Sequence, residues 1–359
     1  MSARSLDLVV LGLSLSSSWG NGHATTYRAL LKAFAQRGHR VLFLERDVPW
    51  YAAHRDLPDP PWGRTSLYGS LEELRARHTG DIARADLVVV GSYVPEGVAV
   101  CEWVLANAGG ATAFYDIDTP VTLEKLRDGD REYLSPELVG RFDLYLSFTG
   151  GPTLEVLERE FGAHRALAFY CLVDPEAYPP AASGVRWELG YLGTYSDDRQ
   201  PALERLLLEP ATLLPEERFA VAGPEYPEEI RWPANVERID HLAPAEHPAF
   251  YGSQRFTLNV TRARMREAGW SPSVRLFEAA ACGVPVISDR WDGLEQLFAP
   301  DEEVLIADSA EDVVDYLREV GEEERQAIGG RARRRVFAEH TAARRCEQLE
   351  GEIAGVMAG

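Results

Sequence analysis

Short apolar runs alternate with amphipathic segments along the first half of the chain. Residues 24–37 are typical of a helix, because apolar side chains recur there at helical spacing and Gly38 follows as a stop. Strands that alternate with helices usually pair in parallel, so this half predicts a doubly wound α/β domain. The helix would bury Tyr27, Leu30, Leu31 and Phe34, and the candidate strands are residues 6–15, 40–45, 86–90, 111–116 and 142–147.

The alternation is interrupted once and then resumes. Residues 172–184 are rich in proline and small side chains, as linkers often are. A second set of strands is predicted at residues 187–192, 218–222, 256–260, 284–288 and 304–307. We therefore expect a Rossmann-like domain over 1–172, a linker over 173–186, a second Rossmann-like domain over 187–340 and a final helix over 341–359. Ligand sites in such domains lie at the carboxyl ends of the strands.

Residues 269–289 are the most informative stretch, because they combine a loop, a short helix and a buried strand. Ser271 or Ser273 can cap this helix, Pro272 suits its first turn, and Gly283 suits a left-handed end. A helix start presents backbone N–H groups and a positive dipole end, which together suit a phosphate.

Two charged side chains of this helix are further candidates for ligand binding. Arg275 and Glu278 lie three positions apart, so both can project from one helix face near the expected phosphate seat at Ser273 and Val274. A cation for a diphosphate and a carboxylate for ribose hydroxyls would serve a nucleotide-sugar. An ordinary βα unit with a surface ion pair is the alternative interpretation.

The stretch resembles the nucleotide-sugar signature of GT-B glycosyltransferases, in particular the CgeB-like group, which is related to retaining transferases. In the wider family two glutamates flank this loop and helix start. Glu278 matches the second, whose implied role is to hold the donor ribose, whereas Trp270 stands at the first position. The resemblance implies two facing Rossmann-like domains with a cleft between them, and a final helix that crosses back to the first domain.

The first βα turn supplies a second candidate site. Gly20 and Gly22 would permit a tight turn, and His23 falls at the helix start, where the dipole favours a neutral imidazole. The turn resembles the glycine-rich loop of several GT-B enzymes. Thr25 stands where a dinucleotide-binding fingerprint would need its third glycine. We interpret His23 as a site residue, with a helix-capping or core histidine as the alternative.

Asp116 and Asp118 follow an apolar strand and would lie at its carboxyl end. An Asp-x-Asp pair can hold a divalent metal, but the GT-B resemblance implies no metal. Asp118 could orient an acceptor hydroxyl or act as a base. Equally, it could be the N-cap ahead of Pro120.

Further candidates follow strands in both halves. Arg199 sits where related transferases carry a basic residue for the donor diphosphate, and Arg262 would reach the same edge. Exposed arginines with no ligand are the alternative. In the first half, Trp50 and Tyr51 could line an acceptor pocket, or could cover the core under a long loop.

Composition narrows the class of protein. The 359 residues carry a net charge of −20, which argues against a surface that tracks nucleic-acid phosphates but leaves room for a small basic pocket. The four cysteines are scattered, without metal-binding spacing, which is typical of reduced cysteine in a cytosolic protein. The first apolar run is too short to span a membrane and lacks a signal-peptide cleavage pattern.

The sequence therefore predicts a metal-independent glycosyltransferase without a bound cofactor. It would move a sugar from a nucleoside-diphosphate-sugar donor to a hydroxyl of a small-molecule or glycan acceptor. The family relationship favours retention, and inversion with His23 as base stays open. A nucleotide-sugar epimerase of the same architecture and a non-catalytic paralogue are the alternatives, the latter because Trp270 replaces an acid.

Overall fold

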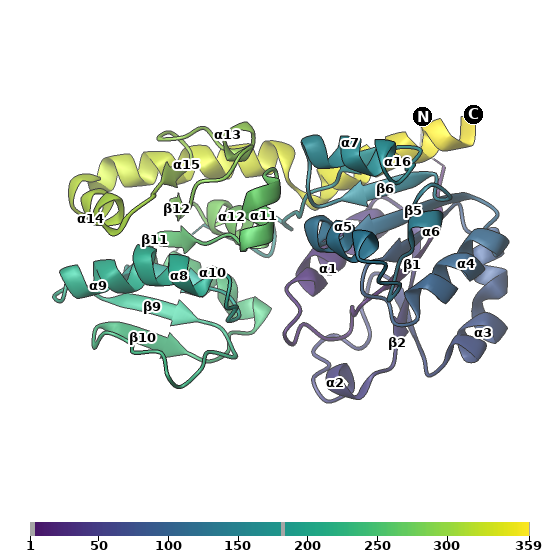
Figure 1. Ribbon diagram of the computed structural model, residues 1–359, viewed down its shortest axis with the longest axis horizontal. Helices are drawn as coiled ribbons and strands as arrows, with labels where there is room; N and C mark the ends of the chain where they lie inside the picture. Colours follow the sequence, from purple (N-terminus) through teal and green to yellow (C-terminus); the bar gives the residue numbers. More distant parts are fainter. Residues whose placement is uncertain (1–3, 181–183, 359) are drawn as a thin grey trace. The chain divides into compact units, whose positions relative to one another are not determined.

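The computed structural model describes residues 4–180 and 184–358. The chain divides into two compact units, Met1–Tyr170 with Ala342–Gly359, and Cys171–Thr341 (Figure 1). The expected linker, 173–186, falls within the second unit, and its residues 181–183 lie outside the described part.

The first unit is built on a seven-stranded sheet with the order β3-β2-β1-β4-β5-β6-β7, in which every strand pair is parallel. The strand order reverses between β1 and β4, which is where doubly wound sheets open a crevice. The strands are β1 (Asp7–Gly12), β2 (Arg40–Arg46), β3 (Arg64–Tyr68), β4 (Leu87–Gly91), β5 (Ala111–Asp116), β6 (Leu144–Ser147) and β7 (Ala166–Ala168). All five strands predicted in this half are confirmed, whereas β3 and β7 were not predicted.

Helices cover both faces of this sheet. In α1 (His23–Gln36) the predicted face of Tyr27, Leu30, Leu31 and Phe34 is buried, and Gly38 follows with a φ of 90°. Helix α16 (Ala342–Ala358) packs on α1, and its Cys346 thiol lies 3.7 Å from the Leu30 carbonyl oxygen. The other helices are α2 (Pro49–Ala52), α3 (Leu71–Arg84), α4 (Gly97–Asn107), α5 (Thr119–Arg127), α6 (Pro136–Val139) and α7 (Pro152–Arg159).

The second unit has a six-stranded sheet with the order β10-β9-β8-β11-β12-β13, again with every pair parallel. Its strands are β8 (Trp187–Leu192), β9 (Phe219–Ala222), β10 (Val236–Ile239), β11 (Gln254–Asn259), β12 (Val286–Ser288) and β13 (Leu305–Ile306). Strand β10 was not predicted, and β12 begins two residues later than expected because Val284 and Pro285 lie in the connection between the preceding helix and the strand.

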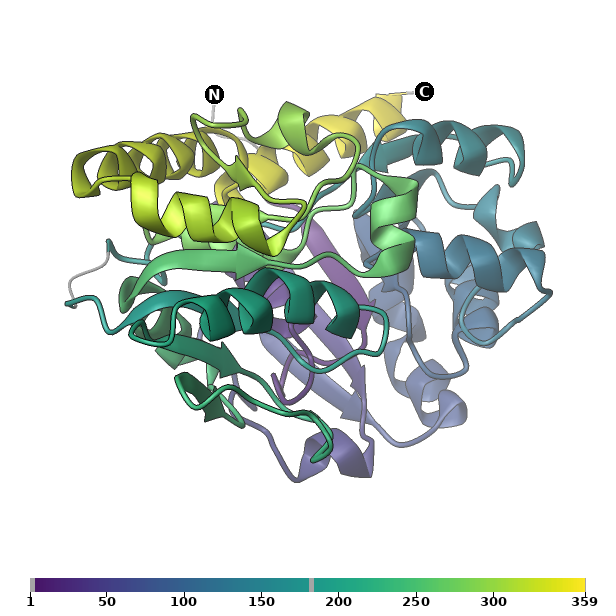
Figure 2. The ribbon, with the colours of Figure 1, turned by 60° about the vertical axis from the view of Figure 1, so that its left-hand side comes forward.

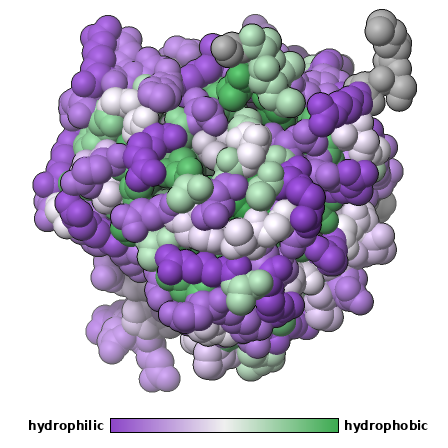
Figure 3. All heavy atoms as spheres, turned by 90° about the vertical axis from the view of Figure 1, so that its right-hand side faces the viewer, coloured by the Kyte–Doolittle hydropathy of each residue, from purple (hydrophilic) through white to green (hydrophobic). Residues whose placement is uncertain are grey.

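A continuous helical stretch packs on this second sheet (Figure 2). It comprises α8 (Gln200–Leu203), a π-helical turn (Glu204–Leu208) and α9 (Glu209–Leu213), and its leucines join the apolar cluster of β8 and β11. The other helices are the 3₁₀ turn Pro244–Glu246, α10 (His247–Gly252), α11 (Ala263–Ala268), α12 (Val274–Ala281), α13 (Leu294–Leu297), α14 (Ala310–Glu319) and α15 (Glu322–Glu339). On the face in Figure 3 most of the surface is hydrophilic, and hydrophobic residues form small, separate groups.

Candidate functional site

The start of α12 lies at the carboxyl edge of the second sheet, as expected. The helix begins at Val274 with Ser273 as its N-cap, so Pro272 lies before the helix and the prediction that it occupies the first turn is wrong. The Ser273 hydroxyl does not cap the helix. Instead it donates to Asn259 Oδ1 at the end of β11, at 2.7 Å. Gly283 ends the helix with a φ of 74°, which confirms the predicted left-handed stop.

Arg275 joins this helix to the ends of two strands. Its Nε donates to the Leu192 carbonyl oxygen at 2.5 Å, and its Nη1 donates to Asn259 Oδ1 at 2.8 Å. The guanidinium carbon lies 4.4 Å from the centre of the Tyr191 ring, and the residue is only 7% exposed. The cation is therefore held rigidly beside the N-terminus of α12.

The loop after β8 passes directly over this arginine. A Cβ atom at Gly193 would come within 2.8 Å of Arg275 Nη2 and 2.7 Å of the Tyr191 hydroxyl. Real Cβ atoms do not approach other atoms so closely, so a side chain at this position would force the Arg275 guanidinium and the Tyr191 ring to shift. The result is a backbone segment that closely approaches a fixed cation and a helix start, as phosphate-binding loops do.

Glu278 is buried and already engaged. Its Oε1 accepts from the Tyr178 hydroxyl at 2.6 Å and its Oε2 accepts from the Tyr251 hydroxyl at 3.1 Å. Glu278 was expected to project near the phosphate seat and to hold the donor ribose, and in the structure each of its carboxylate oxygens accepts from a tyrosine hydroxyl. Its role toward a ribose stays a prediction.

A histidine completes this buried cluster. His247 Nδ1 lies 3.4 Å from Glu278 Oε2. Burial raises the pKa of Glu278, but His247 and the two tyrosine hydroxyls outweigh this effect and leave the pKa below its usual value. Burial likewise lowers the pKa of His247, and the Glu278 carboxylate reverses the shift, so the His247 pKa is raised. No sequence pattern pointed to Tyr178, Tyr251 or His247, because these residues are distant from Glu278 along the chain.

Arg199 and Arg262 lie in loops that follow neighbouring strands. Arg199 Nη2 donates to the Thr194 carbonyl oxygen at 2.7 Å, within the loop after β8. Arg262 Nε lies 3.7 Å from Asp198 Oδ2, and Asp198 also accepts from the Ala263 backbone N–H at 3.0 Å. The two arginines therefore flank an interaction that ties the loop after β8 to the start of α11.

An aromatic cluster that the sequence analysis did not predict lies at the same edge. The Arg238 guanidinium carbon is 4.2 Å from the centre of the Tyr226 ring and 4.7 Å from that of Trp232. The Tyr226 hydroxyl donates to the Gly193 carbonyl oxygen at 3.1 Å, which links this cluster to the loop above Arg275.

Trp270 stands where the resemblance implies the first of the family's two glutamates, and it occupies a strained turn. Its φ is 43°, and its backbone N–H donates to the Asp292 carbonyl oxygen at 2.6 Å. The indole packs so closely on Gly293 that a Cβ atom there would lie 2.4 Å from the ring. Packing of the ring against backbone explains how a tryptophan fits here.

In the first unit, a buried carboxylate shapes the loop after β1. Glu45 is inaccessible to solvent and accepts from the backbone N–H groups of Leu15 and Ser16, at 2.7 and 2.9 Å. The hydroxyls of Ser16 and Ser14 donate to it at 2.6 and 3.1 Å. The sequence analysis did not single out Glu45, because its partners lie some thirty positions earlier in the chain.

His23 is the first residue of α1, as predicted, and is half-buried. Its backbone N–H donates to Asn21 Oδ1 at 3.1 Å, and its ring lies 5.6 Å from that of Phe148, between centres. Gly20 has a φ of 60° and so suits glycine, whereas Gly22 is the N-cap with a φ of −61°, which any residue can adopt. The structure therefore shows a conformational need for glycine at Gly20 and not at Gly22.

Asp116 and Asp118 belong to a network of hydroxyls at the end of β5. Asp116 is fully buried and accepts from the Tyr145 hydroxyl at 2.6 Å and the Thr122 hydroxyl at 2.9 Å. Burial raises the pKa of Asp116 to about 6. Asp118 accepts from the Tyr93 hydroxyl at 2.9 Å, and although it holds the N-cap position of α5, its side chain makes no capping bond. Within residues 4–180 and 184–358, no group of three or more His, Cys, Asp or Glu side chains is arranged to hold a metal ion.

Trp50 and Tyr51 differ in their surroundings. Both lie on α2, where Tyr51 is buried and Trp50 is 57% exposed. The residues that follow pack on the loop after β1: His54 stacks on Trp19 with ring centres 4.3 Å apart, and Asp56 accepts from the Ser18 hydroxyl at 2.8 Å. Of the two candidates, Trp50 presents an aromatic face to solvent.

Residues 199–351 match the sequence model of a family described as glycosyl transferase-like. A search of curated proteins gave no match. Among the described residues, no helix is long and apolar enough to cross a membrane.

Solved structures match nearly the whole chain. The Anabaena protein HepE in complex with UDP and glucose has a TM-score of 0.72 at 13% identity, covering 97% of this chain and 99% of that one. Sucrose-phosphate synthase from Thermosynechococcus elongatus has a TM-score of 0.71 at 14% identity, covering 98% and 100%. An alpha-glucosyltransferase in complex with UDP-glucose and DNA containing an abasic site has a TM-score of 0.71 at 13% identity, also covering 98% and 100%. Together with the two parallel sheets, these matches confirm the predicted GT-B fold class.

Proposed function

We propose that the protein is a glycosyltransferase that moves a sugar from a nucleoside-diphosphate-sugar to an acceptor hydroxyl. The observation that carries the proposal is Arg275, a buried cation fixed beside the start of α12 and beneath the Gly193 loop. The family match over residues 199–351 includes this site and supports the same conclusion. Assignment to the CgeB-like group is part of the proposal and rests on residues 269–289.

The donor diphosphate would be held by groups that the second unit already positions. The first backbone N–H groups of a helix have no partner within it, so those near Val274 can donate to a phosphate oxygen. Arg275, with Arg199 and Arg262 in the adjoining loops, would offset the charge that develops on the departing diphosphate. Protein cations can fill this role without a metal, and we propose a metal-independent reaction.

Glu278 can still contribute to donor binding. A carboxylate has about four lone-pair positions, and the hydroxyls of Tyr178 and Tyr251 occupy one on each oxygen. A ribose hydroxyl would therefore bind at a remaining position or replace a tyrosine hydroxyl. The tyrosines fix the orientation of the carboxylate in either case.

The first unit would serve the acceptor. His23 at the start of α1 and Asp118 after β5 lie at the carboxyl edge of its sheet, and either could orient the acceptor hydroxyl or take its proton. We propose retention of configuration, in which the donor phosphate assists deprotonation and His23 is a positioning group. The acceptor would be a small molecule or a glycan, since the net charge of −20 disfavours a nucleic acid.

A non-catalytic sugar-nucleotide-binding protein is a second candidate. Trp270 favours it, because an indole packed on Gly293 stands where the wider family has a carboxylate. Turnover assays separate the candidates. Release of nucleoside diphosphate that rises with an acceptor supports a transferase, an isomeric nucleotide-sugar would indicate an epimerase, and nucleotide binding without turnover would support the second candidate.

A further inference from the structure

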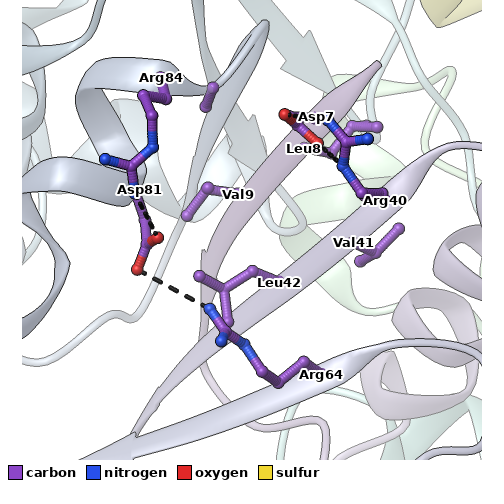
Figure 4. Close-up of a pocket in the computed structure, with 10 residues that line it drawn as sticks. Asp7, Leu8, Val9, Arg40, Val41, Leu42, Arg64, Asp81 and Arg84 are labelled. Carbon is purple, nitrogen blue, oxygen red and sulfur yellow. Dashed lines mark hydrogen bonds and ion pairs between the residues drawn. The ribbon is translucent and has the colours of Figure 1, made fainter. Parts of the chain in front are cut away.

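The first unit has a hollow of about 350 Å³ at the amino edge of its sheet (Figure 4). Its walls include Asp7, Arg40 and Arg64, which begin β1, β2 and β3, and Ala85, which follows α3. These positions mark the amino edge of the sheet, whereas His23 and Asp118 follow carboxyl ends. A ligand here would not occupy the proposed acceptor site.

The floor of the hollow is aliphatic. It is formed by Leu8, Val9, Val41, Leu42 and Ala85. Each of these residues is largely buried, yet together they leave an apolar surface between charged walls, as Figure 4 shows for Val9, Val41 and Leu42. An apolar floor with a few polar groups at its rim is the usual composition of a small-molecule pocket.

The two walls differ in charge. On one, the Arg40 guanidinium is paired with the Asp7 carboxylate, with Nη2 2.6 Å from Oδ2. On the other, Asp81 is shared: Arg84 Nη2 lies 3.2 Å from its Oδ1, and Arg64 Nη2 lies 3.8 Å from its Oδ2. His78 Nδ1 also contacts Asp81 Oδ2 at 2.8 Å. The Asp81 carboxylate therefore pairs with two guanidinium groups, so this wall has an excess of positive charge.

Three arginines and two aspartates line the hollow, so its lining has one net positive charge although the whole chain is acidic. The hydrogen bond from Arg40 lowers the pKa of Asp7 against the effect of burial, and the charges of Arg40, Arg84 and Arg4 lower it further. The Arg64 and Arg84 side chains are 67% and 73% exposed, so an incoming anion can reach both.

We propose that this hollow binds a small molecule with an apolar body and one acidic group. The acidic group would lie between Arg64 and Arg84, and the body would cover Val9 and Leu42. The inference does not depend on the proposed function, because it uses neither the nucleotide site nor the acceptor residues.

Isothermal titration calorimetry with naphthalene-2-sulfonate tests the proposal, since this probe joins a bicyclic apolar body to one permanent anion. We expect saturable binding of one molecule per chain. Naphthalene-2-sulfonamide has the same body without the charge, and inorganic phosphate has charge without the body, so both should bind at least about tenfold more weakly. The Arg64→Gln/Arg84→Gln double variant should lose a similar factor in affinity for the sulfonate.

A matched variant tests whether sulfonate binding depends on these two arginines or only on the total charge of the protein. Arg131→Gln/Arg159→Gln removes two other exposed, acid-paired arginines of the first unit and should leave sulfonate binding unchanged. Thermal unfolding without ligand verifies that both double variants fold. Absence of saturable binding, equal binding of the sulfonamide, or undiminished binding by the Arg64/Arg84 variant would each overturn the proposal, whatever the protein does with nucleotides.

Discussion

The Tyr178 hydroxyl donates to Glu278 Oε1 at 2.6 Å, across a separation of one hundred residues in the sequence. Tyr178 precedes β8, in the segment expected to be a linker, while Glu278 lies within α12, the helix whose start forms the proposed phosphate seat. The second oxygen of Glu278 holds Tyr251, so the carboxylate connects three separate segments of the second unit. This cluster makes the site helix part of the core of the unit.

Removing the Tyr178 hydroxyl should lower stability without removing the nucleotide site. Tyr178→Phe loses a buried hydrogen bond to a charged group, and we expect the free energy of unfolding to fall by about 1.5–3 kcal/mol. Urea denaturation measures the loss. A nucleotide that stabilises the wild type should still stabilise this variant, because Glu278 keeps its charge and Tyr251. Loss of nucleotide binding with stability unchanged would contradict this view of Tyr178.

Asp116 should make stability fall as pH rises from about 4 to 6. Its folded-state pKa is raised to about 6 from an ordinary 3.8, so the fold favours the protonated form. The stabilisation is complete below the unfolded-state pKa and is lost as pH rises through the folded-state value, a change on the order of 3 kcal/mol.

Urea denaturation across this pH range tests the assignment. Asp116→Asn keeps the shape of the side chain but cannot titrate, so its stability curve should lack the decline. The wild type and the variant should therefore differ in slope between pH 4 and 6, and parallel curves would show that Asp116 is not the group responsible.

The loop after β1 should depend on Glu45. Glu45→Gln replaces a carboxylate that accepts four hydrogen bonds by an amide that presents donors to some of the same N–H and hydroxyl groups. We expect a loss of about 2–4 kcal/mol, because buried donors are left unsatisfied. Glu96→Gln is the control: Glu96 is exposed and pairs with Arg46, so its effect should stay within about 0.5 kcal/mol. Equal effects of the two substitutions would show that the buried network does not organise this loop.

Gly193→Ala should impair nucleotide binding more than folding. The new methyl group would press on Arg275 Nη2 and the Tyr191 hydroxyl, so the guanidinium must move from its place beside α12. We expect nucleotide affinity to fall at least about tenfold, equivalent to 1.4 kcal/mol. Gly321→Ala is the matched substitution, since a Cβ atom there meets nothing within 4 Å. Calorimetric titration measures the nucleotide affinity of both variants. Unchanged affinity in Gly193→Ala would show that the position of Arg275 does not matter for nucleotide binding.

The sequence predicted those parts of the fold that carry strong local patterns. The apolar strands at the centres of both sheets and the amphipathic face of α1 are examples. Strands β3 (Arg64–Tyr68) and β10 (Val236–Ile239) escaped prediction because they are short, carry charged residues and lie at sheet edges, where one side of the strand is exposed. The parallel neighbours that define them are distant in the sequence.

The candidate site was likewise predictable only where local sequence patterns define it. Arg275 and the helix start at Ser273 were predictable from the spacing of residues 269–289. The partners of Glu278 and Glu45 were not, because tertiary contacts alone bring Tyr178 or Ser16 to those carboxylates. Pro272 was misplaced because the helix begins after Ser273, whereas a first-turn proline would need the N-cap at Ser271.

The central claim is that the carboxyl edge of the second unit binds a nucleoside diphosphate, and a thermal-shift measurement tests it most directly. Wild type, Arg199→Gln/Arg262→Gln and the control Arg186→Gln would be screened against UDP, GDP, ADP, CMP and dTDP, with and without chelator. Arg186 is also an acid-paired arginine of the second unit, but it lies at the amino end of β8. We predict that one diphosphate stabilises wild type and control by about 3 kcal/mol at a hundredfold excess over Kd, regardless of chelator, and that the double variant loses most of this stabilisation. No stabilisation by any nucleotide, or equal stabilisation of all three proteins, would contradict the account.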